Sequence, residues 1–299
     1  MNILVSGSTG LVGSALLRAL QSRGDQVTRL VRSEPAAGDR AIRWDPDQGK
    51  LDLAGLEAID VVVHLAGENI ASGRWTAEKK ARIRDSRVKG TRLLSETLSR
   101  LTQPPRVLVA ASAIGFYGDR GDELLTEVSP RGSGFLAEVC QEWEQATQPA
   151  SQRGIRVVNL RFGVILSPAG GALAKMLTPF RMGVGGKIGS GRQYMSWIAL
   201  DDATGAVQHA LANGSLHGPV NGVAPRPVTN LEFTKTLGRV LVRPTILPMP
   251  VFAARLAFGE MANELLLASA RVEPSALVKG GYVFGHPDLE GALRFLLGR

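Results

Sequence analysis

Apolar residues recur along the first two-thirds of the chain with two spacings. Short, nearly continuous apolar runs predict buried strands, and apolar residues three or four positions apart predict helices. Asn2–Ser6 is a run of the first kind, and Leu11–Arg23 follows the second spacing. The other predicted strands are Gln26–Val31, Ile59–Ala66, Arg106–Ser112 and Ile155–Arg161, and the other predicted helices are Thr76–Leu101 and Phe135–Arg153. Strands and helices that alternate in this order predict an α/β fold with a parallel, doubly wound sheet.

The pattern changes after Leu166. Glycine becomes frequent over Ser167–Arg192, where few apolar positions are periodic, and Asp201–Asn213 again has a helical spacing. We therefore expect a large domain and a smaller C-terminal lobe. The domain would comprise residues 1–166, completed by about 196–230, and the lobe residues 167–195 and 231–299.

Four segments of the smaller lobe carry weaker signals. We expect a short helix over Ala172–Phe180 and a strand followed by a short helix over Gly280–Arg299. Gly183–Ile188 fails the spacing of a phosphate loop, so we expect a flexible loop that closes over a binding pocket. The apolar segment Ile246–Phe258 fits either a core element or a subunit contact, and the sequence leaves both open.

Composition and charge limit what the chain can be. Its 299 residues are 44% hydrophobic and 21% charged, which is typical of a soluble globular protein. The single cysteine, Cys140, cannot form an internal disulfide, and we find no basic leader and no apolar run of about 20 residues. We therefore expect a cytoplasmic protein with no membrane partner. A net charge of +8 favours partners that carry phosphate.

A glycine motif lies between the first predicted strand and the first predicted helix. It reads Gly7-Ser8-Thr9-Gly10-Leu11-Val12-Gly13. In such a motif Gly7 permits a tight turn, Gly10 lets the backbone approach a pyrophosphate, and Gly13 lets helix and strand pack closely. The free N–H groups at the start of the helix then attract phosphate. This placement predicts a Rossmann-type dinucleotide-binding site, and a tight turn without a ligand is the alternative.

The end of the second predicted strand should contact the adenosine ribose of the dinucleotide. A site that prefers NAD carries Asp or Glu there, hydrogen-bonded to the ribose 2′-hydroxyl. This chain has Arg29 and Arg32 instead, with no acid from Thr28 until Glu34. A guanidinium group can form paired hydrogen bonds with a 2′-phosphate and stack on adenine. Arg32 lies nearer to the strand end, so we favour Arg32 and NADP(H); two solvated surface arginines are the alternative.

Further segments resemble the extended short-chain dehydrogenase/reductase superfamily, which includes nucleotide-sugar epimerases and dehydratases. The resemblance covers essentially the whole chain and is closest to an atypical subgroup, the sugar-nucleotide epimerase-related or epimerase family proteins. The segments that carry it are His64–Ile70, Ser112–Gly118, Leu160–Val164, Gly185–Gly191, Trp197–Asp202 and Asn221–Pro225. The resemblance implies a nicotinamide cofactor on a Rossmann-type sheet, with the substrate held by the C-terminal lobe.

The resemblance also implies roles for residues outside the glycine motif. Leu65-Ala66-Gly67, at the end of a predicted strand, would line the adenine and ribose pocket with backbone. Arg87 stands where the common extended enzymes have asparagine before a Gly-Thr pair, here Gly90-Thr91, and would face the cofactor. Arg161, at another strand end, would lie over the nicotinamide half or the phosphates. Most other basic residues of the helix around Arg87 fit a solvated helix face.

The usual catalytic residues of the superfamily are missing. They are a serine or threonine and a Tyr-x-x-x-Lys pair, in which lysine lowers the tyrosine pKa so that tyrosinate moves a proton while nicotinamide takes hydride. At the matching positions this chain has Ala113, Phe135 and Val139. We therefore take Ser112 and Tyr117 as the catalytic candidates; a buried tyrosine with a satisfied hydroxyl is the alternative for Tyr117. The other polar candidates near the nicotinamide are Arg161 and Tyr194.

Two functions stay open from the sequence. One is an NADP(H)-dependent epimerase or oxidoreductase with a non-standard proton donor and an unknown nucleotide-sugar or carbonyl substrate. The other is a catalytically silent NADP(H)-binding sensor or assembly protein. The histidines lack metal-ligand spacing and Cys140 fits a small buried side chain, so we expect no metal. Aromatic and basic residues do not alternate, so we expect no nucleic-acid partner. We expect the protein to be either a monomer or a homodimer.

Overall fold

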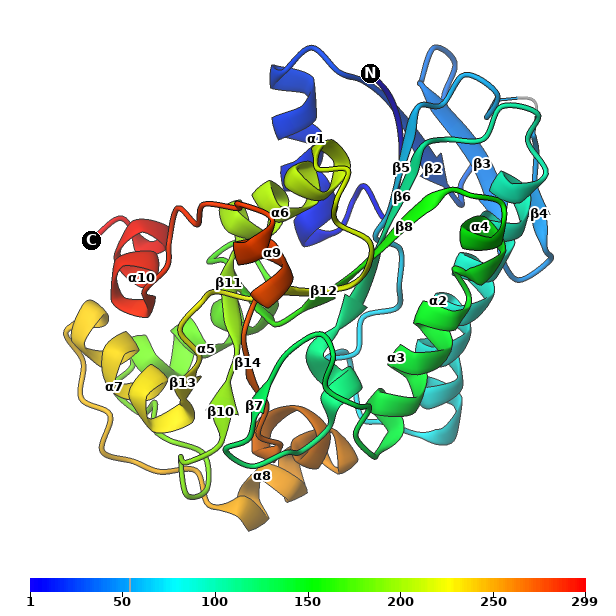
Figure 1. The fold of residues 1–299 in the computed structure, drawn as a ribbon. Helices are drawn as coiled ribbons and strands as arrows, with labels where there is room; N and C mark the ends of the chain where they lie inside the picture. The colour runs from blue at the N-terminus through cyan, green and yellow to red at the C-terminus, as the bar shows by residue number, and fades with distance from the viewer. Residues whose placement is uncertain (54) are drawn as a thin grey trace.

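The computed structural model describes residues 1–53 and 55–299, and an eight-stranded sheet forms its centre (Figure 1). Seven strands are parallel, and β4 runs antiparallel to β3 at one edge. In spatial order the strands are β12 (Gly218–Gly222), β8 (Arg156–Phe162), β6 (Val107–Ala113), β5 (Val61–His64), β1 (Asn2–Ser6), β2 (Gln26–Val31), β3 (Ala41–Asp45) and β4 (Lys50–Leu51). The chain proceeds outward from β1 in both directions, which is the doubly wound, Rossmann-type order. The predicted fold class is confirmed.

Helices cover both faces of the sheet. Alternate strand residues point to opposite faces, so Ile3 packs toward Leu16 on one side and Leu4 toward Leu94 on the other. Because both faces are buried, these strands read in the sequence as continuous apolar runs. One face carries α1 (Leu11–Ser22) and α6 (Leu200–Ala212), and the other carries α2 (Ala77–Ser99), α3 (Phe135–Gln145) and α4 (Gln148–Gln152).

The C-terminal part of the chain builds a second core beside the sheet. Leu173 of α5 (Gly171–Arg181), Phe233 of α7 (Asn230–Leu241) and Leu293 of α10 (Leu289–Leu297) belong to it. The remaining short elements are η1 (Ile114–Tyr117), β7 (Leu124–Leu125), β9 (Val164–Leu166), β10 (Tyr194–Met195), β11 (Trp197–Ala199), β13 (Val228–Thr229), α8 (Val251–Phe258), η2 (Ala262–Leu267), β14 (Arg271–Val272) and α9 (Ser275–Lys279).

The sequence analysis missed or misplaced several elements. It did not predict β3, β4 or α7, although Thr229 and Glu232 form a capping box at the start of α7. The predicted helix Phe135–Arg153 is two helices, because Pro149, in the first turn of α4, has no N–H to donate to the carbonyl of Gln145, where α3 ends. Residues 280–288 were expected to begin with a strand and contain none.

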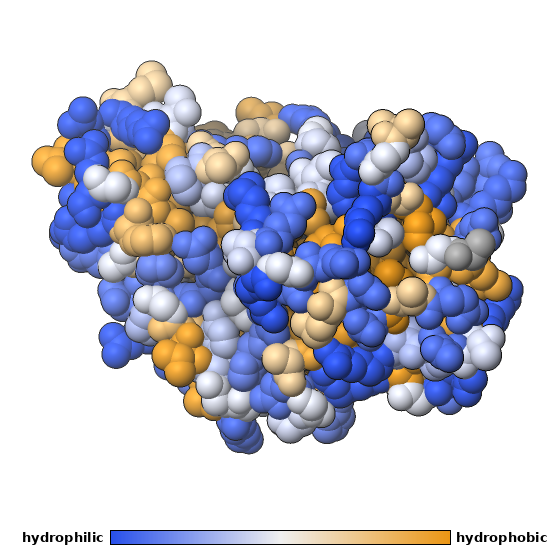
Figure 2. All heavy atoms as spheres, turned by 90° about the horizontal axis from the view of Figure 1, so that it is seen from above, coloured by the Kyte–Doolittle hydropathy of each residue, from blue (hydrophilic) through white to orange (hydrophobic). Residues whose placement is uncertain are grey.

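No helix in residues 1–53 and 55–299 is both long and apolar enough to cross a bilayer. The face shown in Figure 2, seen from above relative to Figure 1, is mostly hydrophilic, with apolar residues scattered among charged ones.

Candidate functional site

The glycine motif forms the loop from β1 to α1 at the carboxyl edge of the sheet. Gly7 has a φ of +68°, and a Cβ atom on it would lie 2.6 Å from the carbonyl carbon of Leu65. A Cβ atom on Gly13 would collide with the carbonyl oxygen of Gly7. The loop is therefore pressed between α1 and the chain that follows β5, and neither position accepts a larger residue.

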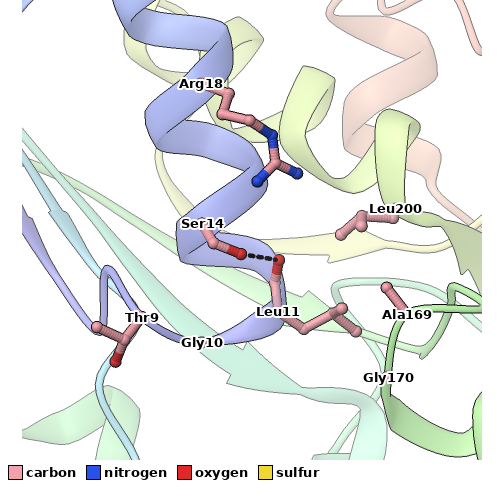
Figure 3. Close-up of a pocket in the computed structure, with 8 residues that line it drawn as sticks. All are labelled: Thr9, Gly10, Leu11, Ser14, Arg18, Ala169, Gly170 and Leu200. Carbon is pink, nitrogen blue, oxygen red and sulfur yellow. Dashed lines mark hydrogen bonds between the residues drawn. The ribbon is translucent and has the colours of Figure 1, made fainter.

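The start of α1 opens on a pocket of about 370 Å³ (Figure 3). Gly10 is the N-cap residue and contributes no side-chain acceptor, and the first turn of α1 contains only uncharged residues. The first N–H groups of the helix are therefore available to an anion, which the helix dipole also favours. The residues that line the pocket are Thr9, Gly10, Leu11, Ser14, Arg18, Ala169, Gly170 and Leu200.

Arg18 lines this pocket although the sequence analysis did not single it out. Figure 3 shows its side chain on the same side of α1 as Leu11 and Ser14, with Leu200 across from it. These three α1 residues are spaced by three and four positions, so helical periodicity was the signal that could have found Arg18. It adds a guanidinium group to a pocket otherwise lined by uncharged residues.

The arginines around the end of β2 differ in their partners. Arg29 forms a 2.8 Å ion pair with Asp39, and Arg43 forms a 2.6 Å ion pair with Glu34. Arg32 is exposed just beyond the strand end and makes no hydrogen bond or ion pair within the described part of the chain. Of the two arginines that the sequence offered for a 2′-phosphate, Arg32 is therefore the one with an uncommitted guanidinium.

A buried histidine fixes the backbone that follows β5. His64 Nδ1 lies 2.6 Å from Ser6 Oγ, and its Nε2 lies 2.9 Å from Thr91 Oγ1. Ser6 Oγ accepts the N–H groups of Leu65 and Ala66 at 3.2 and 3.4 Å, so its own proton goes to Nδ1 and His64 donates through Nε2. Burial lowers the pKa of His64 to about 4, which keeps the ring neutral in this role.

Arg87 supports the next part of the same segment. Its Nη1 donates to the carbonyl oxygens of Glu68 and Ile83 at 3.0 and 3.1 Å. A Cβ atom on Gly67 would lie 3.3 Å from Arg87 Cζ, so the guanidinium packs directly against Gly67. Desolvation by burial lowers the pKa of Arg87, yet an arginine remains charged at neutral pH. The structure thus brings Arg87 to the Leu65-Ala66-Gly67 segment.

Glu144 joins Arg161, Ser112 and Tyr117 into a buried network. Arg161 donates from Nε and Nη2 to the two carboxylate oxygens of Glu144 at 2.7 and 2.8 Å. Ser112 Oγ donates to Glu144 Oε1 at 2.7 Å, and Arg161 Nη1 donates to the Tyr117 hydroxyl at 3.0 Å. The Arg161 guanidinium also lies 3.5 Å from the centre of the Phe116 ring. All three guanidinium nitrogens are used here, so the geometry gives no support to the predicted contact of Arg161 with the cofactor.

The phenol of Tyr117 is completely enclosed. Besides Arg161, its oxygen lies 2.7 Å from Asn221 Oδ1 and 3.0 Å from the carbonyl oxygen of Thr126. Burial is the main cause that raises the pKa of Tyr117, so the hydroxyl stays protonated. The structure favours the alternative that the sequence left open, a buried tyrosine with a satisfied hydroxyl. Glu144 was missed because nothing in its local sequence distinguishes it from the other acids of the helix.

The residues of α3 that pack beside the end of β6 are Leu136 and Cys140. The sequence analysis had placed Phe135 and Val139, each one residue earlier, at the positions of the superfamily's tyrosine and lysine. A Cβ atom on Gly115 would lie 3.2 Å from Leu136 Cβ and 3.7 Å from Cys140 Sγ, so this i, i+4 pair packs on η1. Phe135 packs instead on the Trp75 ring at 5.4 Å. Burial raises the pKa of Cys140 to about 12, which leaves its thiol unreactive. Neither pair, Phe135 and Val139 or Leu136 and Cys140, supplies a tyrosine and a lysine.

Arg271 is a polar residue of the lobe that the sequence analysis missed. Its Nε is buried and has no hydrogen-bond partner among the described residues. Its guanidinium lies 5.1 Å from the ring of Tyr194, which the sequence did single out. A buried donor without a partner is costly unless a ligand satisfies it, so Arg271 is a candidate for holding an anionic group. An isolated arginine in a two-residue strand carries no sequence signal of this kind.

The glycine-rich loop Gly183–Ile188 contacts residues 247–249 through backbone groups. Met249 donates its N–H to the Lys187 carbonyl at 2.8 Å, and Gly189 donates to the Met249 carbonyl at 2.9 Å. A Cβ atom on Gly186 would collide with the Leu247 carbonyl. The loop thus lies against residues 247–249 in this structure, and the flexible lid stays a prediction.

Two family models match this chain. The model of the NAD dependent epimerase/dehydratase family matches residues 3–221. The chain belongs to this family. The model of a domain of unknown function, DUF1731, matches residues 249–296, within the C-terminal lobe of this family member.

Relatives of the family member extend over its full length. It is 46% identical over 293 residues to the epimerase family protein Mb2239 of Mycobacterium bovis, which covers 98% of this chain and 96% of that protein. It is 37% identical over 297 residues to the human epimerase family protein SDR39U1, with 98% and 99% covered. The crystal structure of human SDR39U1 (isoform 2) with NADPH has a TM-score of 0.91 and 35% identity, and covers 100% of this chain and 99% of that one. The family predicted from the sequence is confirmed.

Proposed function

We propose that this epimerase family member binds NADP(H) along the carboxyl edge of its sheet. The observation that carries the proposal is the uncommitted guanidinium of Arg32 beside the open start of α1. These groups follow adjacent strands, β2 and β1, and the backbone of Leu65 and Ala66 follows β5 on the other side. The amides of the glycine loop would hold the pyrophosphate, Arg32 the 2′-phosphate, and Leu65-Ala66-Gly67 the adenosine. The NADPH in the human relative's crystal structure supports this choice.

Replacing Arg32 tests the proposal. In the Arg32→Gln variant we expect NADPH to bind about 10-fold to 100-fold more weakly, because a charged hydrogen bond contributes about 1.5–3 kcal/mol. The affinity for NADH should change little, since NADH has a hydroxyl group in place of the 2′-phosphate. Titration of NADPH and NADH fluorescence measures both affinities. The matched control is Arg29→Gln, which loses the Asp39 partner but should keep the preference. Equal affinities of the unmodified protein for the two dinucleotides would contradict the proposal.

We propose further that the protein is an enzyme of the epimerase or oxidoreductase type with an anionic substrate. The nicotinamide group supplies hydride transfer when the cofactor is bound. Arg271, with its unpartnered buried Nε, would hold the anion, and Tyr194 would pack beside it. This favours a nucleotide sugar, whose diphosphate offers the required oxygens, over an uncharged carbonyl compound. The lobe would thus select the substrate.

Ser112 and Tyr117 act in this proposal as positioning residues. Both are buried, and their hydroxyl groups are held by Glu144 and Arg161 beneath the ends of β6 and β8. They would fix the backbone at Ala113, where the superfamily has its catalytic serine. Because Leu136 and Cys140 supply no acid or base at this end, the proton would be exchanged with water or with a group of the substrate itself.

A catalytically silent NADP(H)-binding protein is the second candidate function. The apolar Leu136–Cys140 face is the observation that favours it, since it removes the usual proton donor. Assays of NADPH oxidation with carbonyl compounds, and of isomerisation with nucleotide sugars, separate the two. Turnover that disappears in Arg271→Gln, with NADPH affinity unchanged, supports the enzyme. Tight NADPH binding without turnover of any of these substrates supports the silent protein.

A further inference from the structure

Half of the large exposed apolar side chains in residues 1–53 and 55–299 lie in two stretches of the C-terminal lobe, residues 182–184 and 242–256. They are eight of sixteen, and we call them the lobe patch: Met182, Val184, Val242, Ile246, Leu247, Met249, Phe252 and Leu256. Ile246 is 81% exposed, and Phe252 and Leu256 are each 73% exposed. Side chains this exposed project into solvent and do not line a groove. The segment Ile246–Phe258, which the sequence left open as core or subunit contact, is therefore mostly outside the core.

Hydrogen bonds join the two stretches that carry most of the lobe patch. Arg243 Nε donates to the Arg181 carbonyl at 2.9 Å, and backbone hydrogen bonds link Met249 with Lys187 and Gly189. These bonds hold residues 181–189 against residues 243–249. Phe252 and Leu256 are four residues apart and therefore lie on one face of α8, which begins just after Met249 in the chain. In Figure 1 the chain from α7 to α8 runs down the left side to the bottom of the molecule.

The chain that forms this surface contains no acid. Residues 145–200 and 233–259 include neither Asp nor Glu, but several Lys and Arg. Beside the patch, Lys187 donates to the Ser190 carbonyl, Arg243 to two backbone carbonyls, and Arg255 to Asn263 Oδ1. These partners are neutral, so the positive charges keep their attraction for an anion outside the chain.

A basic hollow adjoins the patch at Val242. Its volume is about 740 Å³, and its lining includes Lys235, Arg239, Arg243 and Arg294. Glu290 pairs with Arg239 and Arg294. Lys235 and Arg243 have no carboxylate partner within the described residues, so the hollow can receive an anionic group next to the projecting apolar side chains.

Val242, where the hollow meets the patch, is held in an unfavourable backbone conformation. Its φ is +54°, which makes it the one non-glycine residue with positive φ in the described chain, and it caps the end of α7. Glycine or asparagine is usual there, and a β-branched residue is strained. Val242 is also 77% exposed, so packing within the protein does not compensate for that strain. Such a residue points to a contact with something outside the chain.

We propose that the lobe patch docks on the surface of an anionic lipid bilayer. The apolar side chains would enter the interfacial layer, and Lys235, Arg243 and Arg255 would contact lipid phosphates. A second copy is a poor occupant, because a symmetric dimer would bring two acid-free basic surfaces together. Projecting side chains also suit a fluid layer better than a protein partner with preformed pockets. The sequence analysis expected no membrane partner because it considered only spanning segments, which surface docking does not require.

Sedimentation of the full-length protein with vesicles tests this proposal, which does not depend on the proposed cofactor. We expect binding to vesicles of phosphatidylcholine mixed with phosphatidylglycerol, weakening as salt is raised, and no binding to phosphatidylcholine alone. Arg243→Gln and Arg255→Gln should each lower the partition coefficient about five-fold. The double variant Phe252→Ser/Leu256→Ser should abolish binding.

Two control variants change similar exposed residues elsewhere. Arg100→Gln and Val283→Ser should bind vesicles as the unmodified protein does. Unchanged melting temperature and NADPH affinity check that each patch variant is folded. Equal binding to both kinds of vesicle, or binding retained by Phe252→Ser/Leu256→Ser, would overturn the proposal. So would a dimer that this double variant converts to a monomer without any vesicle binding, because the patch would then be a subunit contact.

Discussion

Among single residues, Arg161 and Glu144 form a charged pair that is largely removed from water. Their side chains are 4% and 13% exposed, and two short hydrogen bonds join them. A buried charge is tolerated only while it stays paired and hydrogen-bonded. The pair therefore fixes the hydroxyl groups of Ser112 and Tyr117, and it explains why neither hydroxyl is presented to a ligand.

Glu144→Gln tests the importance of this pair. Removal of one charge leaves the Arg161 guanidinium buried and unpaired, so we expect a loss of about 3 kcal/mol in the free energy of unfolding. Urea denaturation followed by tryptophan fluorescence measures it. Glu142→Gln is the matched control two residues away, because its partner Arg84 is 55% exposed, and it should cost less than about 1 kcal/mol. Equal losses in both variants would show that burial of the pair has no special effect.

The low pKa of His64 predicts how the free energy of unfolding depends on pH. Its folded pKa of about 4 lies below the unfolded value of 6.5, so the unfolded chain binds a proton first as the pH falls. The stability from neutral His64 is complete above the unfolded pKa and is lost between 6.5 and about 4. Relative to a His64→Gln variant, the protein should lose about 2 kcal/mol between about pH 7 and about pH 5. Chemical denaturation of both proteins at the two pH values measures this difference. Equal losses of stability in the unmodified protein and the His64→Gln variant would contradict the prediction.

Among the elements, the loop between β1 and α1 depends on close backbone contact. Gly7 lies against the chain after β5, and Gly13 lies against Gly7, so the start of α1 and two strand ends are held together. The free helix N-terminus is thereby placed at a fixed position on the sheet edge. The glycine motif therefore fixes the start of α1 relative to the ends of both β1 and β5.

Gly13→Ala examines that contact. The added methyl group would meet the Gly7 carbonyl oxygen, and we expect overpacking to cost about 1–3 kcal/mol and to weaken NADPH binding. Gly214→Ala is the control, since a Cβ atom there would meet nothing within 4 Å. Thermal unfolding and NADPH titration of both variants provide the readout. A Gly13→Ala variant as stable as the control would show that α1 can move away from the loop.

In the whole molecule, the C-terminal lobe and the main domain interlock. Glu264 of η2 accepts the Leu136 N–H at 3.2 Å at the start of α3, and Leu277 of α9 belongs to the core of the main domain. The second core around Phe233 gives the lobe a centre of its own. The lobe therefore contributes both to the contact with α3 and to the core of the main domain, and it also carries the lobe patch.

The sequence by itself determined the fold class, the position of the glycine motif and the family. These depend on order along the chain, since residues 2–13 already specify a strand, a turn and a helix start. The edge hairpin β3–β4 was not predicted because Ala41–Asp45 includes the charged residues Arg43 and Asp45 and so breaks the apolar run, and β4 has only two residues.

Only the tertiary structure decided which side chains are committed to partners. Asp39 accepts a hydrogen bond from Arg29, 10 residues earlier in the sequence, and Arg32 keeps an unpaired guanidinium among the described residues. Asn221 accepts a hydrogen bond from the Tyr117 hydroxyl, although the two residues are 104 positions apart. Arg271 looks ordinary in the sequence, and its buried, unpartnered Nε exists only in the folded lobe. Residue type and local spacing specify what a group can do, but burial and long-range contacts decide whether it is free to do it, because they arise only when distant parts of the chain meet.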